Sequence, residues 1–542
     1  MKTSNLYKLL LLGIGFTIST DISAREWKGN TTTTKPNVVS TRAASCAPAS
    51  QNRTLAFNNA SAYIENSGLL WYNRSLGRAS YLIPKDAGTS PIYAGGLWMG
   101  GVDATNQLKL AAIRFRTDGN DYWPGPLSAE NPGNNFDKRN FGQAETDDLT
   151  CKEWDKFYVI TRREVEEFRS WYICTQDPSC DASVDYPGYS IPASITDWPA
   201  HGDVSKFQDY YIAPFYDNDG DGDYDPSNGD YPHYDIEEEV DCRSSRDVTL
   251  YGDFTIWWIF NDKGNIHTES GGDPIGMEIR AQAFSFATND EINDMTFYNY
   301  ELINRSTQTL FNTYFGQNVD ADLGCSDDDF VGCDVGRGLG FAYNGDATDD
   351  NCRGGAIPYG INPPAIGIDF FEGPYQDNDG DSNAFFVNGS TNFLTEAVPG
   401  NGIGYGDGII DNERFGMRRF VYYNRTGEGN VNQQDPTNQV EFYNYLQGLW
   451  KDGVKFQYGG DAYPSTAGGS STTGVDCDFM FPSDPVTGEN TDPEGWGTGG
   501  NTAVAATPWS ESSVGNAPND RRFIQSAGPF TWEPGALNNI TV

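Results

Sequence analysis

Five aspartates occupy every second position at the start of the segment YDNDGDGDYDPSNGDYP, which runs from Tyr216 to Pro232. Alternate residues of an extended segment lie ~6.6 Å apart, so neighbouring carboxylates repel one another by about 0.6 kcal/mol even in water. Calcium offsets such repulsion, because it is a hard cation that takes about six to eight oxygen ligands, often from a D-x-D-x-D-G loop. This acidic loop has Gly222 at the glycine position. Its predicted calcium ligands are Asp217, Asp219, Asp221, Asp223, Asp225 and Asp230.

The acidic loop departs from the full calcium pattern at its last ligand. Asn228 stands where a bidentate glutamate is usual, and Asp230 could substitute for it. Asp223 would contribute its backbone carbonyl. Pro214 argues against an entering helix, so the segment resembles the helix-poor loops of thrombospondin type 3 repeats or dockerins more closely than an EF-hand. The alternative is a solvated acidic turn without a metal.

Two further acidic clusters carry parts of the same pattern. The second cluster combines YQDNDGDSNAFF, in which Ser382 replaces the glycine, with YGDGIIDNERFG, and it predicts one metal site shared between the two stretches. The third cluster, DADLGCSDDDFVGCD, surrounds two cysteines whose disulfide would fold the loop so that its carboxylates converge. A solvated acidic surface is the alternative for both. The candidate ligands are Asp377, Asp379, Asp381, Asp407, Asp411 and Glu413 in the second cluster, and Asp320, Asp322, Asp327, Asp328, Asp329 and Asp334 in the third.

The sequence contains no motif for catalysis. The patterns G-x-S-x-G, H-E-x-x-H and the P-loop do not occur, and His201, His233 and His267 lie far apart. No cysteine spacing is C-x-x-C, so a zinc site is not expected. Glu237 and Glu238 could serve glycoside hydrolysis as a carboxylate pair, but acidic residues are too common here for one pair to be informative. We therefore predict no catalytic residues.

Composition excludes some classes of partner. The 542 residues include 36 basic and 76 acidic side chains, which give a formal net charge of −40. Nucleic acid and anionic lipid both require a basic face, so neither is an expected partner. The acidity suits a protein in an external medium that is rich in divalent cations.

The first residues predict export. Residues 1–24 combine Lys2 and Lys8, a short apolar run and a small residue at Ala24, which is the pattern of a secretory signal peptide. The run is shorter than the ~20 residues of a membrane anchor, and no later segment could span a bilayer. Residues 25–50 lack periodicity and are rich in Thr, Ser and Ala, which predicts a flexible leader.

The sequence after residue 50 predicts a mainly β structure. Short runs rich in aromatic and β-branched residues, such as DFTIWWIFND and GMEIRAQAFSFAT, follow one another without intervening helices. They predict an antiparallel β-sandwich fold with long Asp/Gly-rich loops. Residues 51–250 are expected to form a β-rich region that carries the acidic loop 217–230, and residues 251–542 a β-sandwich region that is truncated at its C-terminal end. A capping box of Thr161 and Glu164 predicts a helix over 162–171, and QVEFYNYLQGLWKDG is the other helix candidate. The chain ends within a strand pattern, so we expect a fragment whose last strand is incompletely paired or lies at a sheet edge.

Nine cysteines in an exported chain predict disulfides. Cys174 and Cys180 are close enough to bridge a local loop, and so are Cys325 and Cys333. The odd number leaves one cysteine free or paired elsewhere. Spacing alone does not determine the full connectivity.

Several long blocks resemble one known group of proteins. YIENSGLLWYNRSLGRASYLIPKDAGTSPIYAGGLWMGGVD, DYDPSNGDYP, DGIIDNERFGM, YLQGLWKDG and DRRFIQSAGPFTWEPGALNNITV are similar to blocks in large surface proteins of bacteria that use type IX secretion. The blocks keep that family's order from about residue 56 onward. The resemblance implies β architecture and a cell-surface location, with a C-terminal sorting domain that this sequence lacks. It implies no molecular activity.

Location and loops together predict adhesion or surface-layer binding by a secreted protein whose acidic loops bind calcium. The partners would be surface glycans or other surface proteins. The alternative is a glycan-binding or glycan-cleaving module in which exposed tryptophans stack on sugar rings. Candidates for that stacking are Trp98, Trp123, Trp257 and Trp258, and at most one of the last two is expected inside the sandwich, because they point to opposite strand faces.

Overall fold

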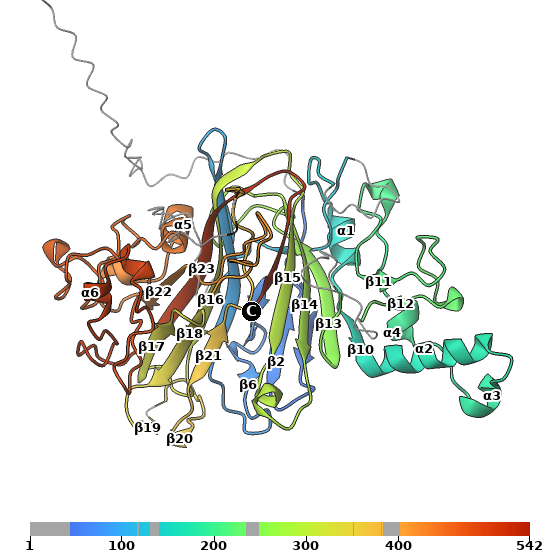
Figure 1. The fold of residues 1–542 in the computed structure, drawn as a ribbon, viewed down its shortest axis with the longest axis horizontal. Helices are drawn as coiled ribbons and strands as arrows, with labels where there is room; N and C mark the ends of the chain where they lie inside the picture. Colours follow the sequence, from blue (N-terminus) through green and yellow to red (C-terminus); the bar gives the residue numbers. More distant parts are fainter. Residues whose placement is uncertain are drawn as a thin grey trace, which may run out of the picture. The chain divides into compact units, whose positions relative to one another are not determined.

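The structure is a computed structural model of the chain, and it describes residues 44–115, 119–130, 140–234, 249–350, 352–380, 382 and 401–542. Two large antiparallel sheets organise these residues (Figure 1). The predicted signal peptide lies outside the described residues. The larger sheet contains, in spatial order, β1 (Asn52–Leu55), β2 (Ser61–Glu65), β3 (Leu69–Leu70), β7 (Ala94–Asp103), β16 (Leu310–Ala321), β23 (Arg521–Trp532) and β22 (Arg419–Asn424), with β6 (Tyr81–Leu82) beside β2 and β8 (Leu108–Ala112) beside β7.

The second sheet is built largely from the middle of the chain. Its order is β10 (Tyr158–Thr161), β13 (Phe254–Asn261), β14 (Met277–Ser285), β15 (Phe297–Asn304) and β24 (Leu537–Thr541), with β9 (Trp123–Pro124) beside β13. Both sheets join strands from either side of residue 250, so the two regions that the sequence suggests share both sheets. The expected class, mainly β with antiparallel pairing, is confirmed.

The main core lies between the two sheets. Trp98 of β7, Phe315 of β16 and Trp258 of β13 are fully buried in it, and the ring of Tyr300 on β15 lies 6.5 Å from that of Phe315. Strand alternation supplies this face, because every second side chain of β13 points toward the facing sheet. The intervening residue Trp257 therefore points away from it.

A second core covers the opposite face of β13. Trp257 packs there with Trp198, at a ring separation of 6.1 Å, and with Phe168 of helix α2. Helices α2 and α4 lie against β10 (Figure 1). The α-helices of the described chain are α1 (Asp148–Glu153), α2 (Arg162–Gln176), α3 (Ala182–Asp185), α4 (Ala193–Thr196), α5 (Gln439–Leu446) and α6 (Thr502–Ala505).

The capping box at the start of α2 is present as predicted, and the helix runs to Gln176 rather than 171. The amide of Glu164 donates to Thr161 Oγ1 at 3.1 Å, and the amide of Thr161 donates to the Glu164 carboxylate at 2.9 Å. Thr161→Ala is expected to cost about 1 kcal/mol of local stability, because the hydroxyl satisfies an otherwise unpaired amide. Hydrogen exchange in the first turn of α2 measures this loss. Thr175→Ala, at an exposed site in the last turn, is the control, and equal effects of the two changes would contradict the prediction.

Short elements complete the described chain. They include the three-stranded sheet of β17 (Asp329–Asp334), β18 (Leu339–Asn344) and β21 (Ile366–Asp369), and the pairs β4 (Tyr72–Asn73) with β5 (Arg78–Ala79), β11 (Phe215–Tyr216) with β12 (Tyr231–Pro232), and β19 (Thr348–Asp349) with β20 (Gly360–Ile361). The 3-10 helices are η1 (Val204–Lys206), η2 (Pro226–Asn228), η3 (Glu291–Asp294), η5 (Val431–Gln433), η6 (Ser465–Ala467) and η7 (Trp496–Thr498).

The disulfides match one sequence prediction and correct another. Cys174 pairs with Cys180 as expected, but Cys325 pairs with Cys352 and not with Cys333. Strand β17 carries Cys333 into the main core, where its buried thiol donates to the Met480 carbonyl, so it cannot turn back to Cys325.

A third disulfide joins Cys46 to Cys151. It fixes the end of the segment that the sequence predicts to be a flexible leader. Ser50 is held as well, because its amide and hydroxyl both donate to the Asp155 carboxylate at 2.8 and 2.7 Å. Cys46 and Ser50, at the end of the predicted leader, are therefore held in place by these contacts.

All four tryptophans considered for sugar stacking are buried. Their exposed fractions are 0% for Trp98, 2% for Trp123, 3% for Trp257 and 0% for Trp258. Only Trp258 of the adjacent pair lies between the sheets, as strand alternation predicts. Stacking of sugars on these tryptophans is ruled out in this fold, because their faces are covered by protein.

The last strand lies at an edge, as predicted. Among the described strands β24 pairs only with β15, at the end of the second sheet. Its outer side is partly covered, because Thr541 exchanges two backbone hydrogen bonds with Glu372, at 2.9 and 3.2 Å. The Arg414 side chain also donates to the carbonyl of Asn539.

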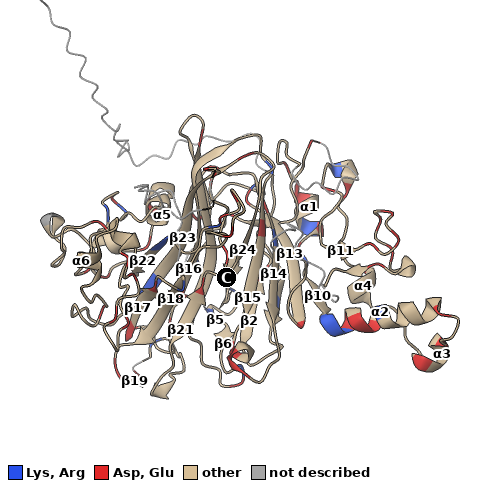
Figure 2. Ribbon diagram, viewed as in Figure 1, with Lys and Arg blue, Asp and Glu red and all other residues tan. Residues whose placement is uncertain are grey.

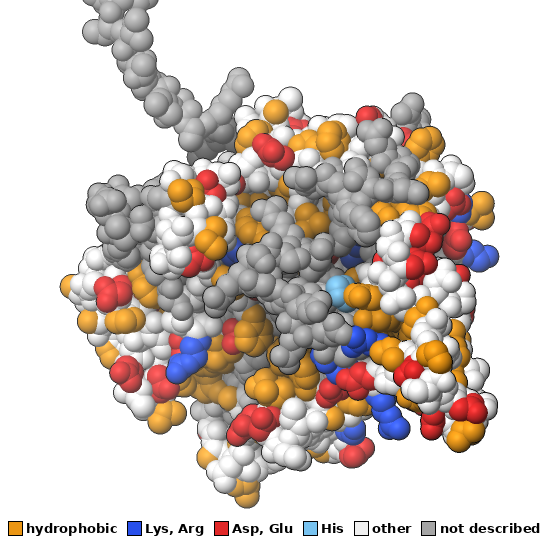
Figure 3. Space-filling model, turned by 45° about the vertical axis from the view of Figure 1, so that its right-hand side comes forward, with side chains coloured by type: hydrophobic (Ala, Val, Ile, Leu, Met, Phe, Trp, Pro, Cys, Tyr) orange, Lys and Arg blue, Asp and Glu red, His pale blue; other side chains and the backbone are white. Residues whose placement is uncertain are grey.

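Charged residues are distributed unevenly over the fold. Acidic residues lie mostly in the loops and helix ends outside the two sheets (Figure 2). Among the described side chains on the face drawn in Figure 3, Lys and Arg lie interspersed with acidic and hydrophobic residues. This distribution matches the net charge of −40.

Candidate metal centres

The acidic loop connects β11 to β12. Gly220 and Gly222 adopt φ values of 76° and 83°, a left-handed conformation that favours glycine. Both of their amides donate to the Asp217 carboxylate, at 2.7 and 2.8 Å. The glycines of the sequence pattern therefore wrap the backbone around the first carboxylate of the loop.

Three carboxylates of the acidic loop converge. One oxygen each from Asp217, Asp219 and Asp230 lies within 4.8 Å of the other two. Asp230 is fully buried and accepts the amides of Asn218 and Asp225, at 2.9 and 2.8 Å. Burial raises the pKa of Asp230, and the charges of Asp217 and Asp219 raise it further against those hydrogen bonds. A divalent cation between the three oxygens would relieve this repulsion.

The other predicted ligands of this loop have different partners. Asp221 accepts the amide of Asp223 at 2.8 Å, and Asp223 accepts the hydroxyl of Tyr210. Asp225 caps η2 through the amide and hydroxyl of Ser227, at 2.8 and 2.7 Å. The structure thus groups three of the six candidates, with Asp230 in the place that the sequence suggests for a substitute ligand.

The second acidic cluster brings its two stretches together, as the prediction of a shared site requires. The amides of Asp379 and Gly380 donate to Asp411 Oδ1 at 3.0 and 2.8 Å. Asp377, however, binds the amide and hydroxyl of Thr531, and Asp407 accepts the amide of Ile409.

Glu413 is buried in the same cluster, and Asp381 lies outside the described residues. No group of three convergent carboxylates occurs among the described members of this cluster. The second cluster is therefore a weaker candidate than the acidic loop.

The third acidic cluster is reorganised by a residue that the sequence did not indicate. Oxygens of Asp320, Asp322 and Asp520 lie within 4.8 Å of one another, and Asp520 precedes β23, far away in the chain. Arg522 lies 3.1 Å from Asp320 and 3.0 Å from Asp520 and offsets part of their charge. Burial raises the pKa of Asp322 well above its usual value, and Asp320 and Asp520 add to this effect. An internal arginine thus competes with any metal at this cluster.

The remaining members of the third cluster are dispersed. Asp327 forms ion pairs with Arg353 and Arg425, and Asp334 pairs with Arg337 at the surface. Asp329 is fully buried and accepts the amide of Leu323, and burial raises the pKa of Asp328 to about 6. The predicted disulfide that would gather these carboxylates does not form.

A buried network of charged residues lies at the second sheet, and the sequence pattern did not indicate it. Its members are Asp209, Glu278, Arg280, Glu301 and Arg305, each at most 4% exposed. Arg280 contacts all three acids at 3.0 to 3.3 Å, and Arg305 contacts two of them. Glu278, Arg280 and Glu301 alternate with core side chains on β14 and β15, and an isolated strand pattern does not distinguish such residues from solvent-facing charges.

His201 supports the acidic loop from outside. Its Nε2 accepts the amide of Tyr224 at 2.8 Å, so Nδ1 carries the proton and donates to the Tyr210 carbonyl at 3.1 Å. The ring stacks on Tyr210 with centroids 4.0 Å apart. Burial lowers the pKa of His201 from 6.5, although the Tyr210 hydrogen bond and the Asp223 charge oppose this. The loop therefore requires neutral imidazole.

Acid is expected to weaken the acidic loop through His201. Because its pKa is lowered in the folded state, that state binds fewer protons than the unfolded chain. The stabilisation by His201 is complete above the unfolded value of 6.5 and is lost as pH falls through the folded pKa. Hydrogen exchange in the loop at pH 7.5 and pH 5.5 should show this loss in the parent and a smaller one in His201→Gln. The raised pKa of Asp230 acts in the opposite direction in both proteins, so equal pH dependence would contradict a role for His201.

Within the described residues no helix is long and apolar enough to cross a membrane. Comparisons with protein-family models, curated proteins and solved structures found no match to this chain.

Proposed function

We propose that this chain is a secreted cell-surface protein whose β-sandwich displays a calcium-stabilised acidic loop and serves adhesion or surface binding. The observation that carries the proposal is the convergence of Asp217, Asp219 and Asp230. These carboxylates are hard oxygen ligands of the kind that calcium prefers. Without a cation the three carboxylates repel one another. In agreement with this, burial and the charges of Asp217 and Asp219 raise the pKa of Asp230.

The covalent framework supports an extracellular location for this function. Three disulfides join Cys46 to Cys151, Cys174 to Cys180 and Cys325 to Cys352. Disulfides persist in oxidising compartments and are rare in the cytosol. The signal-peptide pattern of residues 1–24 and the resemblance to surface proteins of the type IX system point the same way.

Retention of the purified protein on bacterial outer-membrane preparations tests the proposal. We expect retention in millimolar calcium and its loss in chelator. Without calcium, repulsion between the carboxylates of the acidic loop would open the loop. The variant Asp217→Asn/Asp230→Asn should be retained poorly under both conditions. Asp203→Asn, which alters an exposed cap of η1 outside the loop, is the matched control. The proposal would be refuted if retention were the same with and without calcium and the same in the parent and the double variant.

A further inference from the structure

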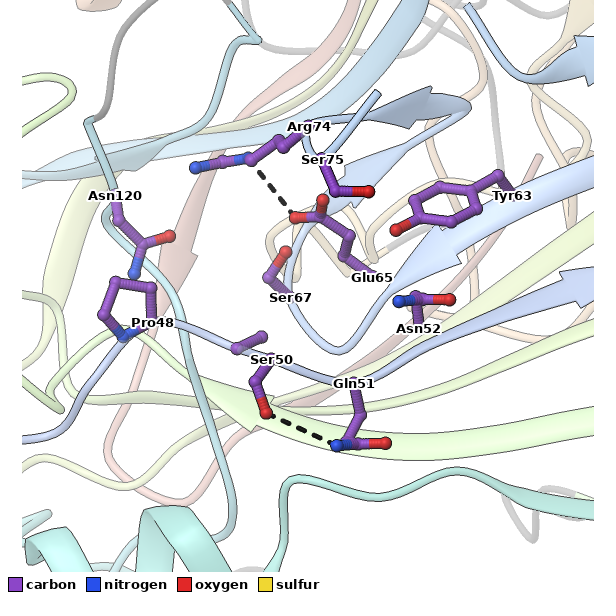
Figure 4. A pocket seen from close by; sticks show the side chains of 11 residues that line it. Pro48, Ser50, Gln51, Asn52, Tyr63, Glu65, Ser67, Arg74, Ser75 and Asn120 are labelled. Atoms are coloured by element: carbon purple, nitrogen blue, oxygen red, sulfur yellow. Dashed lines mark hydrogen bonds and ion pairs between the residues drawn. The ribbon is translucent and has the colours of Figure 1, made fainter. Parts of the chain in front are cut away.

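A cavity of about 200 Å³ lies at one end of the larger sheet, between the anchored segment 48–52 and strand β2 (Figure 4). Tyr63 and Glu65 of β2 form one wall, and Arg74 enters from the turn between β4 and β5. The other side chains labelled in Figure 4 include serines, Gln51, Asn52 and Asn120. Hydroxyl, amide and charged groups thus line the cavity together.

The walls of this cavity are held in place before any ligand arrives. The Cys46–Cys151 disulfide fixes the chain just before Pro48. The Asp155 carboxylate clamps Ser50 and the amide of Gln51, the latter at 3.3 Å. A preformed site loses less conformational entropy on binding than a mobile one, so this anchoring favours recognition of a small ligand.

Arg74 and Glu65 line the cavity as an ion pair, and their side chains keep 27% and 12% of their surface exposed. Arg74 Nε lies 3.3 Å from Glu65 Oε2, and Arg74 Nη2 is buried without a hydrogen-bond partner among the described residues. The exposed part of the Arg74 side chain, by contrast, stays open to a ligand acceptor. Burial raises the pKa of Glu65 although Arg74 lowers it, and burial with the Glu65 charge raises the pKa of Tyr63 to about 12. The phenol therefore remains a neutral donor.

The mixed charge selects the chemical class of the ligand. A carboxylate ligand would meet Glu65, and an ammonium ligand would meet Arg74, so each charged class has one repulsive neighbour. A hydroxyl group both donates and accepts, and adjacent hydroxyls can satisfy Arg74 and Glu65 at once. The cavity is smaller than the ~300–1,000 Å³ typical of drug-sized ligands, which suits one ring rather than an extended chain.

We infer that this cavity binds a neutral monosaccharide unit of a surface glycan. The inference deepens the proposed surface-binding function, and it rests on that function for the glycan source of the sugar. It differs from the sugar-stacking hypothesis of the sequence, because it depends on hydrogen bonds of Arg74 and Glu65 and not on tryptophan faces.

Isothermal titration and saturation-transfer NMR with methyl glycosides of neutral hexoses test the inference. Saturation should give Kd values up to the millimolar range for at least one hexose. Arg74→Met should weaken binding at least about tenfold, because it removes a charged donor. Tyr63→Phe removes only a hydroxyl from the cavity wall and gives a second variant if Arg74→Met unfolds. Arg53→Met, on the exposed side of β1, is the matched control and should bind as the parent does.

Three results would overturn the inference. They are the absence of binding by every neutral hexose, preference for the matching uronic acid or amino sugar, and binding that survives both Arg74→Met and Tyr63→Phe. Failure here remains distinct from failure of the proposed function. Calcium-dependent retention without hexose binding would reject only sugar binding by the cavity. Hexose binding without calcium-dependent retention would reject only the proposed role of the acidic loop.

Discussion

Replacement of Arg305 by methionine is expected to destabilise the folded protein by about 3–5 kcal/mol. Arg305 is fully buried, and its guanidinium contacts Glu278 at 2.9 Å, the Asp209 carboxylate and the Asn140 carbonyl at 2.7 Å. Its removal would leave the three buried acids with Arg280 but without the second guanidinium. Breaking one side of a buried ion pair is costly because the remaining charge has lost its hydration without a partner.

Denaturant unfolding measures this effect, with Arg337→Met as the control. Arg337 makes an ion pair with Asp334 at the surface, where its side chain is 77% exposed, so its loss should have little effect on stability. Adding Glu278→Gln to Arg305→Met should recover part of the stability, because it removes one of the stranded charges. A cost for Arg305→Met no larger than that of Arg337→Met would contradict the expected role of the network.

The same network predicts sensitivity to acid. Burial alone would raise the pKa of Glu278, but Arg305 and Arg280 overcome it and hold the pKa at about 2, below the ordinary value of 4.5. The folded state therefore binds fewer protons here than the unfolded chain. This contribution to stability is complete above pH 4.5 and is lost as pH falls toward 2.

Calcium is expected to raise the melting temperature of the protein. A ligand that binds only the folded state adds about 2.7 kcal/mol of stability at a free concentration one hundred times its Kd. The gain would come from Asp217, Asp219 and Asp230, whose mutual repulsion a cation removes. Differential scanning calorimetry in millimolar calcium and in chelator measures it, and superimposed melting curves would count decisively against a calcium site.

Substitutions separate the ligands that the structure groups from those that the sequence alone suggested. Asp217→Asn/Asp230→Asn should abolish the calcium-dependent shift, because it removes two of the three convergent carboxylates. Asp221→Asn should leave most of the shift, since the Asp221 carboxylate lies outside this group and accepts the amide of Asp223. A complete loss with Asp221→Asn would show that calcium binds in the sequence-predicted register instead.

Local signals were the ones that the sequence revealed correctly. Helix α2 was identifiable because Thr161 and Glu164 are three residues apart and bond to each other directly. The alternation of β13 likewise placed Trp258 and Trp257 on opposite faces. The Cys174–Cys180 bridge also closes over a short span. In each case the interacting groups are neighbours in the chain, so their spacing determines their geometry.

Partly local signals gave partly correct results. The D-x-D-x-D-G spacing of the acidic loop predicted that carboxylates gather, and the glycine turns fold it around Asp217. Spacing did not indicate which carboxylates remain in the group. Asp223 is drawn to Tyr210 and Asp225 to the start of η2, because partners outside the motif compete for them.

The tertiary structure alone decided the features that join distant segments. β16 pairs with β7 on one side and β23 on the other, which brings Asp320 and Asp520 together across about two hundred residues of sequence. Cys325 pairs with Cys352, whereas strand β17 carries Cys333 into the core and away from Cys325. Whether a charged residue such as Glu278 faces solvent or a buried partner likewise depends on what packs over its strand. A sequence specifies its contacts along the chain by spacing, whereas contacts across the sheets arise only when the whole set of strands closes on a common core.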